Sequence, residues 1–571
     1  MRTSGSDQET LDDASAAHPT LTILALSLIA IAIFVIRLTG LPDLVDNEYR
    51  LGASVLNVVQ GGNWITPHDA FGNTDKPPML TWLSALVSLA VGRVNAFTLY
   101  LPTALATLAL VLLVFTTGRR YFGWRAGLFG ALMYLSSNVV SQQIATARWD
   151  GVFALTVALV ALAAFHAWTS EHGWTIFWLA AAVSTLTKGP LGLVLGSLGL
   201  LAVPWERRSG HPRPLRGSHA LGIVLFLAIV GGWFLAAYRQ AGSHLIDNMV
   251  RSELVRHAMM RAPGHRFRKP PSDFLANFAP WSLLTLLGIW HVWSAPAAED
   301  GARRFERFCC WWFAGGLFLF AISPHNPARL LYPIIPPAAI IAGRELARIA
   351  RAVGPHTIFR GCALVTVIAL TCFVAKYHHF DRRREHIRKT LALLDLHANV
   401  HDRTGDDFPL TYVADVPFAL QLTFNTMRPT VTFRQAAVLL RDEAPAYVVV
   451  HDAPRLRREL GRDPPPLYEV AGCSVGSTTY IVIVSNRPTL EWRDQLAMGI
   501  GPLRLRLSGA GVGPTQDGRI VLHSRTDAAS VTVANGASES TTVVLDLEGQ
   551  GPSKRTVRQL TAGETWRVAF E

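Results

Sequence analysis

Apolar residues form long runs over the first two thirds of the chain, and short alternating segments replace them afterwards. The runs are roughly 15–20 residues long, close to the ~20 residues that a helix needs to cross a bilayer. We expect membrane spans at about 20–40, 97–117, 126–141, 151–168, 173–186, 190–204, 218–238, 274–293, 308–323, 328–344 and 359–376. The pattern therefore predicts a polytopic α-helical membrane protein over residues 20–376.

The last part of the chain, residues 377–571, has the pattern of a soluble domain. Turn residues separate short alternating runs, as is typical of strands. These runs are LTYVADV, AYVVVHDA, TTYIVIVS, RIVLHS, SVTVA, TTVVLDL and WRVAF. We expect a C-terminal α/β or mostly β soluble domain. The segment after about residue 490 either belongs to it or forms a small β unit of its own.

Loop charges predict which way the chain crosses the membrane. Segment 77–92 is apolar, and whether it spans the bilayer decides the side of every later loop. If it lies against the outer surface, the basic loops 119–125, 205–219 and 344–360 all fall on the inner side, as the positive-inside rule requires. We therefore expect this segment to be a surface helix.

This orientation assigns each remaining part to a side. Residues 1–19 are expected to form a cytoplasmic tail and residues 377–571 a periplasmic domain. Residues 41–96 are expected to form a first periplasmic loop that contains helices near 47–60 and 78–92.

The composition supports a membrane protein and argues against a nucleic-acid partner. The chain is 50% hydrophobic and 16% charged, against about 25% charged residues in soluble domains. Its net charge is +12, but the positive-inside rule accounts for part of the excess in the short loops. The first apolar run lacks a small-residue cleavage site and is expected to be an anchor. Cys473 is the only cysteine of the soluble part, so we expect no disulfide within it.

Unusual polar residues gather on the expected outer side. They are Asp46, Glu48, Arg50, Asp75, Lys76, Arg148, Asp150 and Lys188, followed by a basic loop at 239–272. A transporter would need such groups through the centre of the bilayer, whereas these predict a site at the outer interface. A carboxylate there can deprotonate an attacking hydroxyl or hold a phosphate through a bound cation, and Lys or Arg can neutralise a leaving phosphate.

Each of these features also has a simpler explanation. Asp46 and Glu48 are suitable caps for the helix that follows them. Lys188 is at a position where long side chains commonly snorkel to the membrane surface, and the basic loop would attract anionic lipid without a specific ligand. Their collection on one side is what favours a site.

Ordered motifs across roughly residues 20–375 carry a resemblance to a known family. They read DNEYR, GGNWITP, DKPPMLTW, RAGLFGALMYLSS, ARWD, LTKGPLG and SPHNPARLLYPIIPP. In order and spacing they resemble the membrane glycosyltransferases of the GT-C fold, in the group of the bacterial 4-amino-4-deoxy-L-arabinose transferases (ArnT-like) and the dolichyl-phosphate-mannose-protein mannosyltransferases. The resemblance implies about 11–13 spans and a polyprenyl-phosphate sugar donor that is used at the periplasmic face.

The resemblance also implies roles for single residues. Asp46, Glu48 and Asp150 would be catalytic; Arg50, Lys76, Arg148, Lys188 and Arg329 would bind the donor phosphate; and Asp75, His265, His325 and Tyr332 would bind substrate. The chain departs from the family at Asn47, which stands where the family's catalytic aspartate is expected. Either Asp46 takes that role after a shift of one residue, or Glu48 does, or the enzyme is altered.

These observations predict an inverting glycosyltransferase of the bacterial inner membrane. It would move a sugar from polyprenyl phosphate to lipid A, another glycolipid, a polymer or a protein at the periplasmic face. Its expected partners are the donor, the outer-leaflet acceptor and membrane lipids. The sequence indicates no particular cofactor, and a divalent cation would suit the acids. Two other hypotheses stay open: a transporter or flippase for a lipid-linked substrate, and a scaffold without catalysis, which Asn47 favours.

Overall fold

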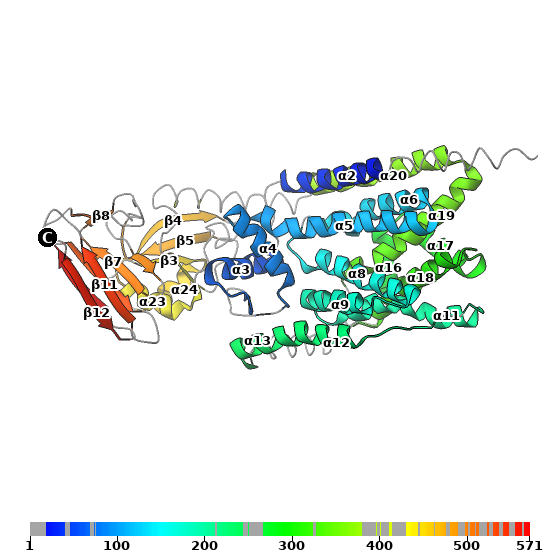
Figure 1. Ribbon diagram of the computed structural model, residues 1–571. Helices are drawn as coiled ribbons and strands as arrows, with labels where there is room; N and C mark the ends of the chain where they lie inside the picture. The colour runs from blue at the N-terminus through cyan, green and yellow to red at the C-terminus, as the bar shows by residue number, and fades with distance from the viewer. Residues whose placement is uncertain are drawn as a thin grey trace, which may run out of the picture. The chain divides into compact units, whose positions relative to one another are not determined.

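The computed structural model describes residues 19–39, 46–68, 74, 76–144, 146–211, 214–243, 249, 267–323, 327–379, 396, 400, 410–413, 430–442, 446–461, 463–474, 480–488, 497–500, 503–508, 510–512, 522–524, 529–535, 541–547, 554–561 and 565–570. The chain divides into two compact units: Met1–Thr390 with Phe418–Met427, and Leu391–Pro417 with Arg428–Glu571. The described residues of the first unit are helical, and those of the second form mainly strands (Figure 1).

The first unit is built from helices, which lie where the spans are expected. In chain order they are α2 (Pro19–Thr39), α3 (Asp46–Gly61), α4 (Met79–Val91), α5 (Ala96–Phe122), α6 (Trp124–Ser136), α7 (Asn138–Gln143), α8 (Trp149–Ser170), α9 (Trp174–Lys188), α10 (Leu191–Ser197), η1 (Leu198–Leu201), α11 (Ala202–Arg208), α12 (Ala220–Phe226), η2 (Leu227–Gly231), α13 (Gly232–Ala241), α16 (Lys269–Asn277), α17 (Ser282–Ser294), α18 (Asp300–Ile322), η4 (Ala328–Ile334), α19 (Ile335–Val353) and α20 (Pro355–His379). Each expected span falls on one of these helices or on consecutive ones.

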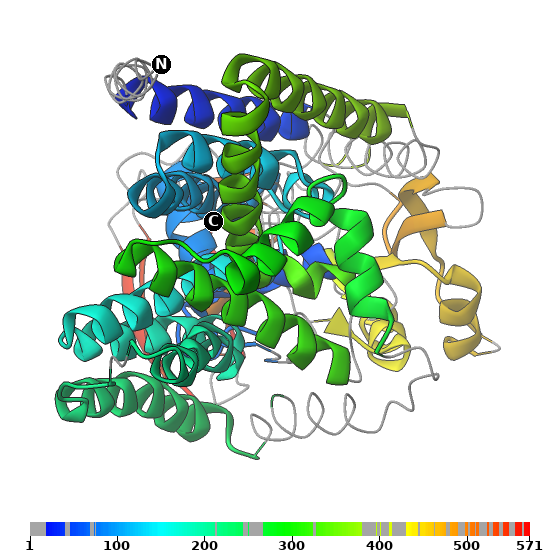
Figure 2. The same cartoon turned by 90° about the vertical axis from the view of Figure 1, so that its right-hand side faces the viewer.

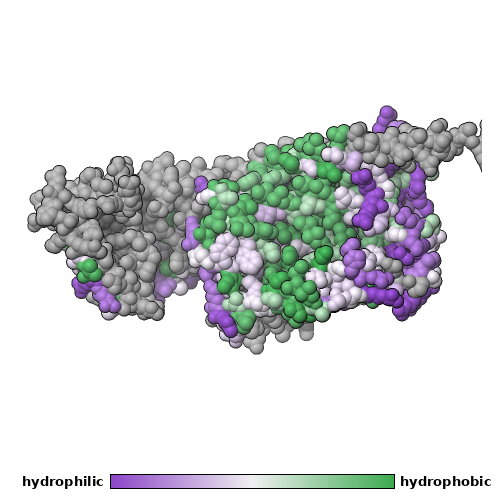
Figure 3. Space-filling view, viewed as in Figure 1, coloured by the Kyte–Doolittle hydropathy of each residue, from purple (hydrophilic) through white to green (hydrophobic). Residues whose placement is uncertain are grey.

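The described helices confirm a multi-pass membrane protein. Seven of them are long and apolar enough to cross a membrane, or eight if the bent pair α16 and α17 counts as one span. An apolar band covers the visible face of the bundle, and hydrophilic residues lie at its end (Figure 3). Helix α4 has 13 residues, so its length of ~20 Å is short of the ~30 Å hydrocarbon core, which favours the surface placement expected for 77–92.

Burial distinguishes the central helices from the peripheral ones. The segment from η4 through α19 is 89% buried over its apolar window, whereas the windows of α2 and α20 are only 22% and 17% buried. Figure 2 shows α2 and α20 on the outside of the bundle. The exposed leucine, isoleucine and valine side chains of these two helices are therefore suited to contact lipid.

Close helix contacts in the centre depend on glycine. A Cβ added to Gly343 of α19 would lie 2.6 Å from the backbone nitrogen of Gly130 on α6, and it would also collide with the carbonyl oxygen of Ala126. Small residues let helix backbones approach in this way, and such contacts are common between helices in membranes. They fix α19, and with it η4, against α6.

We predict that Gly151→Ala destabilises the contact between α8 and α5. An added Cβ would overlap Cγ2 of Thr103, and such overpacking typically costs about 1–3 kcal/mol. Thermal unfolding of the full-length protein in detergent measures the loss. Adding Thr103→Ser, which removes the colliding methyl group, is expected to restore most of it. A Gly151→Ala protein as stable as the wild type would contradict the packing.

The second unit begins with a mixed five-stranded sheet, which confirms an α/β domain. Its elements are β1 (Leu410–Val413), β2 (Thr430–Val431), α23 (Phe433–Arg441), β3 (Tyr447–Val450), α24 (Ala453–Glu459), β4 (Tyr468–Ser474) and β5 (Tyr480–Ser485). The strand order is β2-β1-β3-β5-β4, with β1 parallel to β2 and β3, and β5 antiparallel to β3 and β4. Every residue of β3 is buried, as expected for a central strand.

Further strands follow residue 490. They are β6 (Ala497–Ile500), β7 (Leu503–Ser508), β8 (Ala510–Val512), β9 (Leu522–Ser524), β10 (Ala529–Asn535), β11 (Thr541–Leu547), β12 (Lys554–Leu560) and β13 (Thr565–Phe570). They form a sheet of order β13-β10-β7-β6 and two hairpins, β11-β12 and β8-β9. Each of the seven expected runs contains a strand. The boundary expected near residue 490 falls between β5 and β6 and stays a prediction.

Candidate active site

Three expected site residues from distant parts of the sequence meet at one end of the bundle. Asp150 lies in the first turn of α8, and Lys188 is the last residue of α9. The Nζ atom of Lys188 donates to Oδ1 of Asp150 at 2.5 Å, and Nε of Arg329 in η4 lies 3.6 Å from Oδ2. An acid at a helix start and a base at a helix end both suit the helix dipoles, so each residue has a local reason for its place.

The cluster is buried on the side of Asp150 and exposed to its surroundings on the side of Arg329. The Asp150 carboxylate is 7% exposed and Lys188 is 18% exposed, whereas Arg329 is 37% exposed. Two cations share one buried carboxylate, so the cluster carries one excess positive charge. Arg329 is held only loosely by Asp150, which leaves guanidinium donors that can bind an anion such as a phosphate.

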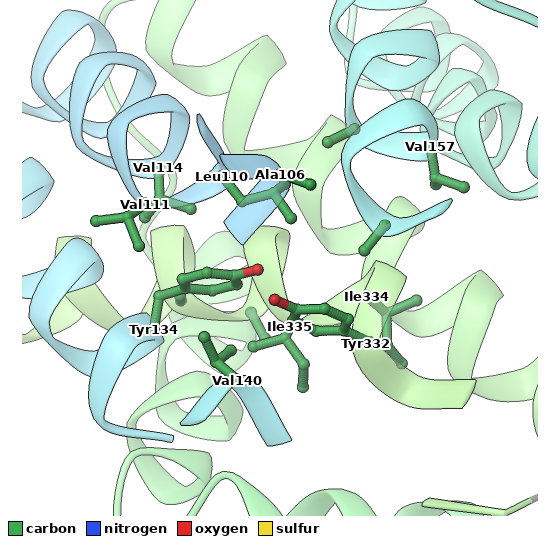
Figure 4. Close-up of a cluster of buried hydrophobic side chains, with 14 of the residues drawn as sticks. Ala106, Leu110, Val111, Val114, Tyr134, Val140, Val157, Tyr332, Ile334 and Ile335 are labelled. Carbon is green, nitrogen blue, oxygen red and sulfur yellow. The ribbon is translucent and has the colours of Figure 1, made fainter. Parts of the chain in front are cut away.

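Arg148 and Tyr332 lie next to this cluster. Arg148 precedes α8 in an extended conformation, and its carbonyl accepts a hydrogen bond from Thr103 at 3.5 Å. Tyr332 is fully buried, with its hydroxyl 3.0 Å from that of Thr107. Its ring stacks on Tyr134 at 6.3 Å between centroids, and the two hydroxyls point toward one another (Figure 4). Tyr332 is thus part of the core in this structure, and its binding of substrate stays a prediction.

The first expected outer loop carries the other candidate residues. Asp46 and Glu48 lie in the first turn of α3, but their side chains are outside the described residues. Arg50 is exposed one turn further along α3, and Lys76 is half-buried just before α4. Helices α3 and α4 contact each other, and α4 also contacts α9, the helix that ends at Lys188.

Three expected substrate-binding residues cannot be placed. Asp75, His265 and His325 all lie outside the described residues. Among the residues that the structure does describe, no group of three or more His, Cys, Asp or Glu side chains could hold a metal ion. The hypothesis that acids on the outer side hold a divalent cation stays a prediction, because the side chains of Asp46, Glu48 and Asp75 are outside the described residues.

Two tryptophans attach the segment after α3 to its surroundings. The indole N–H of Trp82 on α4 donates to the carbonyl of Trp64 at 2.6 Å. The indole N–H of Trp233 on α13 donates to the carbonyl of Ile65 at 3.0 Å. The stretch between α3 and α4 is therefore anchored to two other helices of the bundle.

His68 adds a polar contact that the sequence did not reveal. Its Nε2 lies 3.2 Å from Nδ2 of Asn57 on α3 and 3.4 Å from Nδ2 of Asn63. A histidine beside two asparagine amides fixes the end of α3 relative to the following loop. Neither residue type nor spacing points to this pairing, because the three residues meet only through the turn after α3.

A second charged cluster, which we call the arginine network, lies at the other end of the bundle. Glu206 of α11 is fully buried, and its carboxylate lies 2.6, 3.6 and 3.7 Å from nitrogens of Arg307, Arg303 and Arg304 on α18. Glu306 and Glu345 pair there with other side chains: Arg344 at 2.9 Å, and His291 at 3.0 Å. The sequence predicts no site at this end.

Known proteins resemble this chain in both sequence and structure. A family model described as dolichyl-phosphate-mannose-protein mannosyltransferase matches residues 75–233. An undecaprenyl phosphate-alpha-4-amino-4-deoxy-L-arabinose arabinosyl transferase of Pseudomonas aeruginosa (strain LESB58) is 27% identical over 349 residues, which cover 58% of this chain and 60% of that protein. The crystal structure of ArnT from Cupriavidus metallidurans bound to undecaprenyl phosphate matches with a TM-score of 0.64 at 17% identity, over 82% of this chain and 98% of that one.

The chain resembles ArnT in sequence and has the GT-C fold. The apo form of the Cupriavidus metallidurans ArnT gives the same result, with a TM-score of 0.62 over 84% of this chain. This chain spans about 60% of the length of the curated relative from Pseudomonas aeruginosa. The family resemblance noted in the motifs is thus confirmed, and the Asp150–Lys188–Arg329 cluster belongs to an ArnT-like membrane bundle.

Proposed function

We propose that the chain is an inverting glycosyltransferase of the bacterial inner membrane that uses a polyprenyl-phosphate sugar. The observation that carries the proposal is the cluster of Asp150, Lys188 and Arg329, with its excess positive charge and its partly exposed guanidinium. The names of the relatives support it, because they describe transfer from an undecaprenyl-phosphate sugar or from dolichyl-phosphate mannose. In this proposal the N-terminus is cytoplasmic and the C-terminal domain periplasmic.

The reaction needs a base and a stabilised leaving group. An acceptor hydroxyl attacks the anomeric carbon, a new carbon–oxygen bond forms, and the bond from that carbon to the phosphate oxygen breaks with inversion. Asp46, with Glu48 as the alternative, would take the hydroxyl proton. Arg329 and Lys188 would neutralise the charge that develops on the departing polyprenyl phosphate, with Lys76, Arg50 and Arg148 as further phosphate ligands.

Asp150 would act differently from the other acids. Both of its carboxylate oxygens face cations, so it is committed to holding Lys188 and Arg329. A buried carboxylate in that arrangement fixes the cations before the donor arrives, so they need no rearrangement when charge develops. We therefore assign it to positioning of the phosphate ligands.

Deletion of the gene tests the proposal. Mass spectrometry of polyprenyl-phosphate sugars and outer-leaflet glycolipids should show a lipid-linked sugar accumulating and one glycan losing a sugar. An Asp46→Ala variant should behave like the deletion, and Glu171→Ala, at the turn between α8 and α9, should behave like the wild type. If neither the polyprenyl-phosphate sugars nor the glycolipids change in the deletion strain, the proposal is contradicted and a transporter or scaffold is favoured. If the deletion removes the glycan's sugar but Asp46→Ala keeps full activity, the role of base would be assigned to Glu48.

A further inference from the structure

Three arginines follow one face of α19 at the end of the bundle that carries the arginine network. Arg344, Arg348 and Arg351 are spaced four and three residues apart, which places them on one face of a helix. Exposure increases along the stripe: the Arg344 side chain is 11% exposed, Arg348 is 42% exposed, and Arg351 is exposed as well. The stripe therefore runs from the interior to the surface of the bundle.

Acidic partners compensate only the inner part of this stripe. Arg344 lies 2.9 Å from Glu306, and Nε of Arg348 lies 3.4 Å from buried Glu345. Nη2 of Arg348 also lies 2.7 Å from Nε2 of His291. Arg351 has no such partner in the part of the chain that the structure describes, and Nη1 of Arg348 has none there either. Two carboxylates thus face three guanidinium groups, and the uncompensated donors are at the surface.

Two exposed tryptophans lie on the helix that packs against α19. Helix α17 packs against α19, and its Trp290 and Trp293 are 67% and 64% exposed. Trp293 also packs against Trp205 of α11, with 4.4 Å between ring centroids. The guanidinium of Arg307 lies 4.7 Å from the centroid of that Trp205 ring. Aromatic side chains with one polar atom are typical of the depth at which lipid headgroups lie.

The apolar face of α17 continues from these tryptophans into the bundle's lipid-facing surface. Leu283, Leu286 and Leu287 are 68%, 46% and 39% exposed, and they precede Trp290 by one to two helical turns. A molecule that contacts the whole surface would therefore need an apolar chain and an anionic head. A free phosphate or a nucleotide would match only the arginines.

We propose that α17 and the arginine stripe of α19 bind one anionic phospholipid of the inner leaflet. The phosphate is held by Arg348 and Arg351, the glycerol region lies against Trp290 and Trp293, and an acyl chain follows the leucines of α17. Basic pockets between membrane helices are known to bind such headgroups. This site lies at the opposite end of the bundle from Asp150, so lipid binding there does not depend on the proposed transferase activity. Only the leaflet rests on the proposed orientation, in which the N-terminus is cytoplasmic.

Native mass spectrometry of the full-length protein tests the proposal, with cardiolipin, phosphatidylglycerol or phosphatidylethanolamine added at equal concentration. The wild type should retain cardiolipin or phosphatidylglycerol at least fivefold more than phosphatidylethanolamine. The double variant Trp290→Leu with Arg351→Gln leaves the Arg348–Glu345 pair intact and should lose most of this preference. Raising the salt concentration should weaken retention in the wild type, since part of the attraction is electrostatic.

The matched control is Arg216→Gln, which removes one positive charge at the same end of the bundle but from the loop before α12. It should retain anionic lipid as the wild type does, and so should Arg351→Lys, which keeps the charge. Equal retention of all three lipids by the wild type would overturn the proposal. Equal loss in the double variant and in Arg216→Gln would overturn it too, because the attraction would then come from overall charge.

Discussion

Asp150→Asn is expected to lower the rate of sugar transfer by about a hundredfold. The substitution keeps the size of the side chain but removes the charge that holds Lys188 at 2.5 Å and Arg329 at 3.6 Å. The loss of one preorganised charge contact at a developing anion commonly costs on the order of 10²–10³ in rate. Initial rates with purified protein and a polyprenyl-phosphate sugar measure the effect. Because Lys188 and Arg329 remain and can still bind the donor phosphate, we expect the loss mainly in kcat and little change in KM.

A matched acid on another helix provides the control. The cation that acts on Asp273 of α16 is Lys269, which lies on the same helix and outside the cluster, and α16 contacts η4, which carries Arg329. Asp273→Asn should therefore change the rate less than twofold. Equal losses in Asp150→Asn and Asp273→Asn would show that any acid near η4 matters, and the positioning role of Asp150 would be wrong. Partial recovery with Asp150→Glu would support that role, because the charge is restored in a slightly shifted position.

The helices of the membrane unit could be predicted because their signal is local. A long apolar run identifies a buried or lipid-facing helix without knowledge of its neighbours, and each expected span falls on helix. The seven expected strand runs of the C-terminal part were recovered for the same reason. The sequence does not predict short elements with weaker patterns, such as β2 and β8, because a few residues carry too little periodicity.

The candidate site could be predicted only as a set of residues on one side of the membrane. Asp150 and Lys188 were expected at the same interface, and Arg329 near a phosphate. In the structure the Asp150 carboxylate contacts both cations, because α8 packs against α9 and against η4. The sequence does not specify this packing. The buried position of Tyr332 likewise depends on its contacts with Tyr134 and Thr107.

The arginine network shows where reasoning from charge goes wrong. The expected span 308–323 begins after the charged residues Arg303, Arg304 and Arg307, because charges are costly inside a membrane. Helix α18 instead begins at Asp300 and buries two of these arginines. The cost is offset by Glu206, which lies on α11 and is about a hundred residues away in the sequence. A partner at that distance cannot be recognised from local pattern.

This network makes Glu206→Gln the substitution with the largest expected effect on stability. It leaves Arg303, Arg304 and Arg307 without their shared carboxylate, and removal of one partner from a buried ion pair costs about 3–5 kcal/mol. Thermal unfolding of the full-length protein in detergent should show a loss of several degrees, without any lipid-linked substrate present. The exposed pair Glu171–Arg216, at 4.0 Å, provides the comparison. Glu171→Gln should cost less than ~1 kcal/mol.

A double substitution distinguishes two causes of the instability of Glu206→Gln: unpaired charge and lost packing. In Glu206→Gln with Arg307→Met, the carboxylate and the arginine nearest to it, at 2.6 Å, are both removed, and an apolar side chain of similar length replaces the arginine. If uncompensated charge is the cause, the double variant should be more stable than Glu206→Gln alone, since one stranded guanidinium has been removed. If the network contributes mainly by packing, the two losses should add. A Glu206→Gln protein that unfolds at the wild-type temperature would mean that water already compensates these arginines.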